Sequence, residues 1–525
     1  MKAILICLTA VFTALFAKSQ TIDLAKENDF FGDAKTAALA GSIGAFGGTF
    51  ASAMQNPAGL ALCFKNEFTI NPFVKAKRVE SMMHKNAVTD ERWKNGIGSI
   101  GLVYGLDKIS KNKIAMKRKK GQWSNLNLGV GFVRTADFNE RLLAEGINGK
   151  NSLLDAFLEK VNFGEGIQPQ NLDPMGAGLA FQAMLIDTIP RQFPYDSVKY
   201  FSVIPNGGEM QSFSRERSGS AKSFVVNFAA TYGKKLSLGV ALTRSSVNFN
   251  EHVVYREADL AADLIPYLNS FTYERDVLAV GRGFGLKGGA IFQATNWLNL
   301  GLSGQTPMFM NIVEVRTARF KSDIIDRNLE AQSPEEVVAY QIATPSKAIA
   351  SFGFSNAAKS FTLNLDYEAI DYQSLRVRTP DVAFDQNRDI RTTLKPTANL
   401  RVGLEGKIKK VVLRGGVAAA GNPLVGNPFI QMKWDPDNLA ANFSDNLKAF
   451  ERTTLAFGFG LNEVFKSKKA GFSQKKIEYY VDCSFAVTKN NNPPLWLYKL
   501  EKGDAPVVVG ASIERRAVLT LGVRF

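Results

Sequence analysis

The sequence contains very little histidine and cysteine, and it has a low proportion of charged residues. Among 525 residues there are 2 His and 3 Cys, and 22% of the residues are charged. This leaves little for a His-rich metal site or His-centred catalysis, and it excludes a disulfide-stabilised scaffold. Beyond the first 19 residues the sequence has no run of the roughly 18 apolar residues that a membrane helix needs. We therefore expect neither a helical membrane protein nor a cofactor, metal or catalytic site.

Apolar residues and glycine, in contrast, are abundant. Hydrophobic residues make up 45% of the chain, which has 38 Phe and 44 Gly, and this composition excludes a disordered protein. The first 19 residues consist of Lys2, an apolar run over residues 3–17, and the small residues Ala17 and Ser19 before Gln20. This pattern predicts a secretory signal peptide over residues 1–19 and an exported mature chain.

The last residues alternate strictly between apolar and other side chains. Ala517, Leu519, Leu521, Val523 and Phe525 fall on one face of an extended strand, and the chain stops on the aromatic residue. In an exported chain this ending is typical of the final strand of an outer-membrane barrel. A soluble secreted β-protein would show the same alternation, so strand length and connection length must distinguish the two.

Alternation of this kind recurs along the whole chain. We count about 14 segments, and most reach the roughly 9 to 11 residues with which a tilted strand crosses a bilayer. The segments lie near residues 66–78, 97–106, 124–136, 222–232, 235–250, 273–292, 297–320, 337–354, 360–378, 397–406, 411–425, 452–464, 476–488 and 507–525.

Short and long connections alternate between these segments. Gly233-Lys234 is a tight connection, whereas residues 137–221, 251–272 and 426–451 are long ones. Short periplasmic turns and long extracellular loops are the layout of an outer-membrane barrel. The sequence thus predicts an all-β fold: a 14-stranded antiparallel transmembrane β-barrel with both termini in the periplasm and short helices in its long loops.

The positive charge gathers in the predicted periplasmic turns. These turns hold seventeen basic residues and one acid, Asp107, which favours contact with anionic lipid head groups. Nucleic-acid binding is not expected of an exported barrel. The basic residues are Lys108, Lys111, Lys113, Lys117, Arg118, Lys119, Lys120, Lys234, Lys235, Lys359, Lys407, Lys409, Lys410, Lys466, Lys468, Lys469 and Lys475.

The segment before the first strand differs from a membrane strand. It is rich in small residues, with Gly41, Gly44, Gly47 and Gly48, and it closes on Asn56-Pro57-Ala58-Gly59-Leu60. Small residues permit close packing inside another structure. We predict three parts: the signal peptide 1–19, an N-terminal hatch 20–64 inside the barrel, and the transmembrane barrel 65–525.

This organisation resembles the FadL-type family of outer-membrane long-chain fatty acid transporters, which also includes aromatic-hydrocarbon channels. The resemblance rests on the small-residue lead and its closing motif and on two later hairpins. The hairpin motifs are Thr344-Pro345-Ser346-Lys347 with Gly353, Asp366-Tyr367-Glu368 and Tyr372, and Arg401-Val402-Gly403-Leu404-Glu405 with Leu413-Arg414-Gly415-Gly416 and Asn422-Pro423. The chain departs from the family in that its largest loop follows the third strand.

The resemblance implies passive transport of hydrophobic small molecules through a loop groove, a lumen pocket and a hatch-gated lateral exit. It implies gating by Asn56, Pro57, Ala58 and Gly59, although Asn-Pro is also a common turn signal. Hatch residues at the lumen would contact the ligand or simply anchor the hatch. They are Phe46, Phe50 and Met54.

The long loop after the third strand contains apolar residues at helical spacing, which are hard to explain as solvent-facing. They would line the ligand groove or pack against each other as a lid. These residues are Leu154, Phe157, Leu158 and Val161, followed by Phe181. Leu260, Leu264, Ile265, Leu268 and Phe271 form a second apolar set in the 251–272 loop.

Other functions stay open at this point. A barrel of this kind could act as a scaffold or shuttle for exported proteins, or take up haem or aromatic compounds. An enzyme would need His84 or His252 as its base, and neither lies near a recognisable serine motif, so we expect no enzyme. The expected partners are a hydrophobic ligand, outer-membrane lipids and, in the alternative, an exported protein; we expect a monomer.

Overall fold

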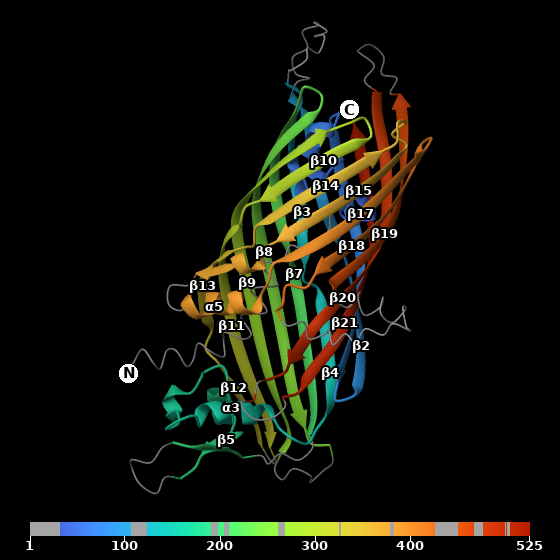
Figure 1. Cartoon of the computed structure of the whole chain (residues 1–525). Coiled ribbons are helices and arrows are strands. Elements are labelled where there is room, and N and C mark those ends of the chain that lie inside the picture. Colours follow the sequence, from blue (N-terminus) through green and yellow to red (C-terminus); the bar gives the residue numbers. More distant parts are fainter. Residues whose placement is uncertain are drawn as a thin grey trace, which may run out of the picture.

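The computed structural model describes most of the chain (Figure 1). The described residues are 32–106, 123–190, 198–203, 209–260, 268–324, 327–378, 383–425, 450–466, 476–498, 500 and 505–525. The predicted signal peptide and several of the predicted periplasmic lysines lie outside these ranges. Among the described helices, none has the length and apolar character to cross a membrane.

Within the described residues, nineteen strands form one closed antiparallel sheet. Several follow one another along one barrel strand, namely β3 with β4, β10 with β11, β12 with β13 and β14, and β15 with β16. Counted in this way, fourteen barrel strands result, and the predicted 14-stranded barrel is confirmed. The strands are β1 (Glu67–Met83), β2 (Asn86–Gly105), β3 (Trp123–Asp137), β4 (Glu140–Asn148), β7 (Glu209–Tyr232), β8 (Leu236–Ala258), β9 (Leu268–Gln293), β10 (Leu298–Gln305), β11 (Phe309–Ile324), β12 (Arg327–Gln332), β13 (Glu336–Ala343), β14 (Lys347–Ser355), β15 (Phe361–Ile370), β16 (Arg376–Arg378), β17 (Thr397–Ile408), β18 (Val411–Gly421), β19 (Phe450–Lys466), β20 (Lys476–Trp496) and β21 (Val507–Arg524).

The first and last strands close the barrel. β1 pairs with β21 from Glu67 opposite Arg524 to Met82 opposite Val509. Because the closure leaves no long free edge at this seam, the main-chain polar groups there are satisfied within the sheet, as a membrane requires. The alternating C-terminal segment is therefore a wall strand.

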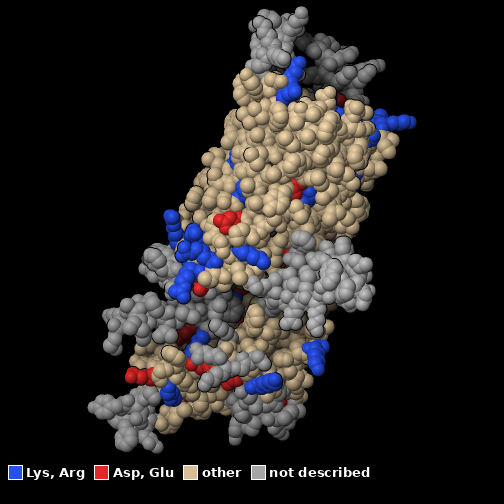
Figure 2. All heavy atoms as spheres, viewed as in Figure 1, with Lys and Arg blue, Asp and Glu red and all other residues tan. Residues whose placement is uncertain are grey.

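Alternation places apolar side chains outside and small or polar ones inside. On β8, Leu238, Val240 and Leu242 are 39 to 51% exposed, whereas Ala241 and Thr243 are buried. Equivalent residues on neighbouring strands form a lipid-facing belt, which Figure 2 shows as a broad area with few charged atoms. We call the side of the belt with short connections the turn end and the other side the loop end; in Figure 1 the turn end lies at the top.

The strands extend well beyond the belt at the loop end. The predicted loop 137–221 contains β4 and much of β7, and β8 and β9 shorten the predicted loop 251–272. Leu268 and Phe271, which we predicted in an apolar loop set, lie in β9, so that prediction is wrong for these two residues. Past the belt the outward positions turn polar, as with Ser246 and Asn248, so the apolar signal weakens although the strand continues.

A small folded unit, here called the loop cap, follows β4. It contains α3 (Leu153–Val161), η4 (Pro169–Asn171), α4 (Ala177–Gln182), β5 (Ile186–Thr188) and β6 (Tyr200–Ser202). Ser152 caps α3, and its side chain and that of Asp155 satisfy each other's main-chain N–H groups. The cap packs onto the loop end of the barrel through a large apolar cluster.

Three adjacent barrel strands are interrupted on one side of the wall. The interruptions lie at residues 306–308, 344–346 and 371–375, and the first two contain Pro307 and Pro345. Proline cannot donate a ladder hydrogen bond, so the strands bend at these points. The third interruption contains η5 (Tyr372–Ser374), and α5 (Ala383–Thr393) follows β16.

Candidate functional site

The N-terminal segment lies inside the barrel. We use the word hatch for residues 32–63, which contain α2 (Ala34–Ala38), η1 (Ala51–Met54) and η2 (Pro57–Leu62). α2 contacts β18 to β21, and η2 contacts β3, β7, β8 and β9. Small residues make this packing possible: a Cβ atom at Gly47 would lie 2.3 Å from the Cα atom of Gly59.

Inward side chains of the barrel satisfy the main-chain groups of the hatch. Asn227 donates from Nδ2 to the carbonyl oxygen of Pro57 at 3.1 Å, and Asp366 accepts from the N–H groups of Ile43 and Gly44. A buried, irregular segment needs such partners because unpaired main-chain groups are costly. Further donors are Asn127 to Leu60 and Cys63, Asn299 to Ala45, Ser303 to Gln55, and Lys287 to Met54.

Asn56 connects two parts of the hatch to the wall. Its Nδ2 atom donates to the carbonyl oxygens of Gly44 (2.9 Å) and Ala290 (3.2 Å), and its Oδ1 atom accepts from the N–H of Ala58 (3.1 Å). The side chain fits because the neighbouring wall residue is Gly289, where a Cβ atom would lie 2.0 Å from Oδ1. The predicted gating motif, including Pro57 and Gly59, thus lies where the hatch meets the inner face of the wall.

A lumen cavity of about 80 Å³ lies between the hatch and the wall. Its lining contains five basic residues and one acid. Arg401 pairs with Glu368 and also approaches the Oε1 atom of Gln55 at 3.4 Å. The charged residues of the lining are Arg134, Lys287, Lys347, Arg401, Arg452 and Glu368.

The three predicted lumen residues have different surroundings. Met54 lines the cavity. Phe50 is 2% exposed and fills the space over Gly101, Gly129 and Gly131 of the wall, so it anchors the hatch. Phe46 packs against Gly353, where a Cβ atom would lie 2.8 Å from its ring.

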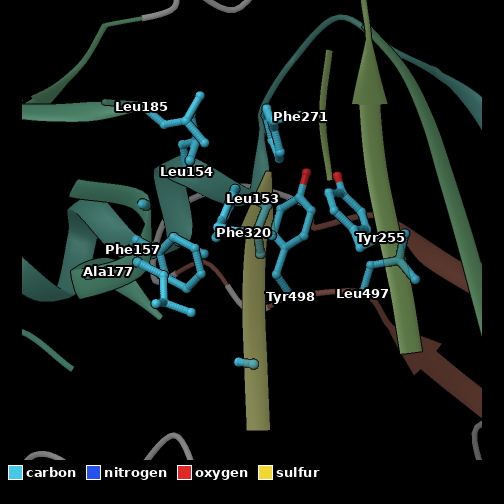
Figure 3. Close-up of a cluster of buried hydrophobic side chains, with 14 of the residues drawn as sticks. Leu153, Leu154, Phe157, Ala177, Leu185, Tyr255, Phe271, Phe320, Leu497 and Tyr498 are labelled. Atoms are coloured by element: carbon cyan, nitrogen blue, oxygen red, sulfur yellow. The ribbon is translucent and has the colours of Figure 1, made fainter. Parts of the chain in front are cut away.

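A second cavity, of about 110 Å³, lies under the loop cap at the loop end. Its lining is mostly apolar and aromatic, with Phe157, Tyr255, Tyr273 and Tyr498 among its residues. Figure 3 shows Phe157 on the cap and Tyr255 and Tyr498 on the opposite side of the cluster. Cap and barrel therefore enclose the space together.

Of the predicted loop residues, one lines this cavity. Phe157 does so and contacts the rings of Tyr273 and Phe320 at 6.3 Å between centroids. Leu154 and Val161 are buried in the cluster that attaches the cap, and Leu158 and Phe181 are half-buried against it. These four residues thus pack as the lid that was the alternative interpretation of the pattern.

One side of the loop-end cavity is charged. Arg217 and Arg275 bind Glu251 at 2.7 and 3.0 Å, and Arg215 binds Glu140 at 3.1 Å. Burial alone would raise the pKa of Glu251, but the two guanidinium groups outweigh it and lower the pKa to about 2. The carboxylate therefore stays ionised and holds both arginines at the cavity.

A buried polar group attaches the cap to the barrel. Glu257 is 1% exposed and accepts hydrogen bonds from the N–H of Leu153 (2.8 Å), from Gln211 (3.3 Å) and from the Tyr255 hydroxyl. Burial raises the pKa of Glu257 from 4.5 to about 7, against the opposing effect of these hydrogen bonds. Its protonation state therefore changes near neutral pH.

The inner face of β9 connects the levels of the two cavities. Arg275 lines the loop-end cavity and Lys287 the lumen cavity, 12 residues further on, or about 40 Å along the strand. The inward residues between them are Val277, Ala279, Gly281, Gly283 and Gly285. Side chains of β11, Ile312 and Met310, cover the first two of these glycines. This strip contains no charge.

The wall has a seam between β2 and β3, where the ladder between the two strands ends and β4 contacts β2 instead. β2 and β3 pair only from Ser99 opposite Val133 to Gly105 opposite Asn127, and β3 changes register against β7 between Arg134 and Ala136. Arg134 lies at this point, 5.4 Å from the centre of the Phe73 ring and 3.0 Å from Asp137. Because Arg134 also lines the lumen cavity, the seam adjoins that cavity.

The sequence interpretation missed the charged residues of both cavities. Arg215, Arg217, Lys287 and Arg401 each occupy an inward position of a strand. The available signal was a charge on the small-residue face of an alternating segment, as with Lys287 among the glycines of β9. Such a charge can only point into the lumen.

A closed barrel that holds an N-terminal hatch defines the class of plugged transmembrane β-barrels, and comparisons with solved structures agree with this architecture. The alignment with a Pseudomonas aeruginosa FadL homologue covers 94% of this chain and 98% of the homologue, at 11% identity and a TM-score of 0.51. The alignment with the deltaS2 mutant of the TodX monoaromatic hydrocarbon channel covers 94% of this chain and 99% of that one, at 12% identity and a TM-score of 0.52. The alignment with the Pseudomonas putida toluene transporter TodX covers 95% of this chain and 99% of that one, at 11% identity and a TM-score of 0.50.

No protein-family model matches the chain, and no curated protein does so. At 11 to 12% identity the likeness to solved structures establishes the fold. The chain has the FadL-type fold.

Proposed function

We propose that the protein is a passive outer-membrane transporter of hydrophobic molecules that carry an anionic group, such as long-chain fatty acids. The observation that carries this proposal is the charge of the lumen cavity, where five basic residues and one acid surround a small space inside the barrel. Such a surrounding favours a carboxylate because charge-assisted hydrogen bonds are strong in a partly desolvated site.

The loop-end cavity would receive the ligand first. Its wall of Phe157, Tyr255 and Tyr273 offers apolar surface, and burial of a hydrocarbon chain contributes about 25 cal/mol per Å². From there the uncharged strip on β9 leads toward Lys287. The arrangement supports a path for an apolar chain between two charged levels.

The lumen cavity is too small for a long ligand unless the hatch moves. Met54 and Gln55 are two of the hatch residues that line it; Met54 ends η1 and Gln55 follows directly. We propose that a ligand displaces this part of the hatch and that Asn56 resists the displacement. The seam beside Arg134 would then provide the lateral exit.

The titles of two structural neighbours name a toluene transporter and a monoaromatic hydrocarbon channel. They support a hydrophobic ligand, whereas the charged lumen of this chain favours an acid over a neutral hydrocarbon. We also propose that the protein is not an enzyme. His252 pairs with Asp276 at 2.7 Å on the exposed face of the barrel, away from both cavities.

The test is ligand binding to the detergent-purified protein. We expect a fluorescent long-chain fatty acid to bind and the matching alkane to compete poorly. A Lys287→Gln, Lys347→Gln double variant should bind the acid about tenfold more weakly, since a hydrogen bond to a charged group is lost. Lys222→Gln is the matched control, because Lys222 lies on the outer face of β7.

Equal binding of acid and alkane, unchanged in the double variant, would contradict the choice of an anionic ligand and favour a hydrocarbon channel. A barrel that binds neither and instead co-purifies with an exported protein would contradict transport altogether and favour the scaffold function.

A further inference from the structure

Three turns at the turn end of the barrel carry charge of one sign. Three described turns contribute six exposed lysines and no acid. The only acid of the β17–β18 hairpin, Glu405, binds Arg414 at 2.7 Å. We use the name lysine rim for these residues: Lys234, Lys235, Lys359, Lys407, Lys409 and Lys410.

Each of these turns holds one lysine in a backbone conformation that other residues adopt more readily. Lys234, Lys359 and Lys409 have φ angles of 66°, 51° and 54°, in the left-handed region. Glycine or asparagine would adopt this conformation with less strain, and they dominate hairpin turns. Each of the three turns nevertheless places a lysine there.

The lysine rim lies directly beside the lipid-facing belt. Tyr232 precedes the first turn and is 42% exposed, Phe361 follows the second and is 49% exposed, and Ile408 in the third is 64% exposed. Exposed aromatic residues mark the boundary between hydrocarbon and head groups. Trp123 and Tyr232 contact each other at this level, 5.3 Å between ring centres. The ammonium groups therefore reach the head-group layer.

The loop end differs in its charge. There the strands carry basic and acidic residues that pair with each other, as in Arg141 with Asp90 and Arg92 with Glu216. Such pairs neutralise each other. The turn end has a pair of this kind as well, Lys65 with Glu478, but the lysine rim itself contains no acid. The asymmetry between the two ends favours an anionic partner at the turn end only.

We propose that the lysine rim is a binding surface for anionic phospholipid head groups of the leaflet at the turn end. Each lysine attracts a phosphate at the level of the aromatic boundary, and the six together enrich anionic over zwitterionic lipid around this end of the barrel. An acidic soluble protein is the less favoured partner, because the turns are only a few residues long and the lysines adjoin the belt.

The test compares lipids retained by protein purified from mixed phosphatidylglycerol and phosphatidylethanolamine nanodiscs, measured by native mass spectrometry. We expect enrichment of phosphatidylglycerol in the natural protein. Substitution of all six lysines by Gln should reduce the enrichment by at least about tenfold, since one lysine near an anionic surface contributes about fivefold. Substitution of all six by Arg should retain it.

The matched control is Lys85→Gln with Lys150→Gln. Lys85 is also exposed in a hairpin turn with a left-handed φ of 69°, but it lies at the loop end. The control should keep the enrichment. Enrichment that survives in the six-Gln variant, or that falls equally in the control, would overturn the proposal, and so would an absence of enrichment in the natural protein. Fatty acid binding, measured on the same samples, reports separately on the transport function.

Discussion

Glu257 is the residue through which pH should act on the loop cap. The pKa of Glu257 is about 7 when the residue is buried under the docked cap and 4.5 when it is exposed. Between pH 4.5 and 7, Glu257 is therefore protonated while the cap is docked and ionised while it is undocked. The contribution of Glu257 to the free energy of cap docking is fully present below pH 4.5 and is lost as the pH rises through about 7. Between these two limits the free energy of cap docking changes by about 3 kcal/mol. We expect hydrogen exchange at the Leu153 amide to accelerate over this range beyond its intrinsic rate.

Glu257→Gln is the corresponding variant, because it keeps the shape and an acceptor but cannot ionise. Its exchange at Leu153 should lose the additional pH dependence. Glu145→Gln, an exposed acid on β4, serves as the control and should behave as the natural protein. If hydrogen exchange at Leu153 depended on pH equally in the natural protein and in both variants, Glu257 would not govern docking of the cap.

Asn56 should determine how firmly the hatch is held. Asn56→Ala removes three hydrogen bonds and leaves the carbonyl groups of Gly44 and Ala290 without this donor. We expect a loss of about 1 to 3 kcal/mol in hatch docking. Hydrogen exchange over residues 44–60 should increase while exchange in the wall strands stays constant.

Asn250→Ala is a suitable comparison, because Asn250 is exposed on the outer face of β8. It should leave exchange in the hatch unchanged. If Asn56→Ala also left it unchanged, the other anchors, such as Asn127 and Asp366, would hold the hatch alone, and the gating role proposed for Asn56 would be wrong.

The sequence pointed to Asn56 through a family motif, but it gave no indication of the atoms that Asn56 binds. Its partners Gly44 and Ala290 are 12 and 234 residues away. Phe50 and Phe157 show the same limit. Both are apolar residues in segments predicted to contact ligand, yet one fills a space over wall glycines and the other lines a cavity. Composition alone cannot separate these environments.

Among the elements, β9 forms the path between the two cavities. Ala279 lies on its inner face and is 1% exposed, whereas Val280 lies on the outer face and is 43% exposed. Ala279→Phe should obstruct the uncharged strip and reduce uptake of a fatty acid into liposomes by about tenfold or more, because the added ring would occupy the inner face along which the chain is proposed to pass. Val280→Phe adds a ring of the same kind toward lipid and should keep uptake.

Folding must be equal in the two variants for this comparison. Both should keep the heat-modifiable gel mobility of a closed barrel and bind fatty acid at the loop-end cavity. Loss of uptake in both would indicate damage to the wall, and normal uptake in Ala279→Phe would place the path elsewhere in the lumen.

Elements were the level at which the sequence was most informative. Period-two alternation identified all the barrel strands because each belt segment has a bulky face and a small one, as in Leu238 to Leu242. The alternation failed as a signal where the two faces of a strand no longer differ in size and polarity. The outward residues of β8 beyond the belt are polar, and the interruptions at Pro307 and Pro345 divide strands that the pattern joined. The seam between β2 and β3 depends on pairing between strands, which no single segment encodes.

At the scale of the whole molecule, barrel and hatch have complementary roles. The barrel provides a lipid-facing exterior and a polar inner face, and the hatch contributes small residues that fill the lumen between the charged cavity and the turn end. Closure of the wall satisfies the main chain in the membrane, and inward Asn and Asp side chains satisfy the main chain of the hatch. The hatch can therefore be removed without leaving unpaired groups in the ladders of the wall.

Removal of the hatch should convert the protein into an open pore. A variant that lacks residues 34–62 loses α2, η1 and η2 but keeps every wall strand, from β1 at Glu67 to β21. In a planar bilayer we expect little ion conductance from the natural protein, because the hatch occupies the lumen, and a steady conductance from the variant. Equal gel mobility with and without heat treatment would confirm that both form barrels. If the variant formed a barrel but stayed closed, side chains of the wall itself, such as Met310 and Ile312 on β11, would have to block the lumen. In that case the hatch could not be the gate.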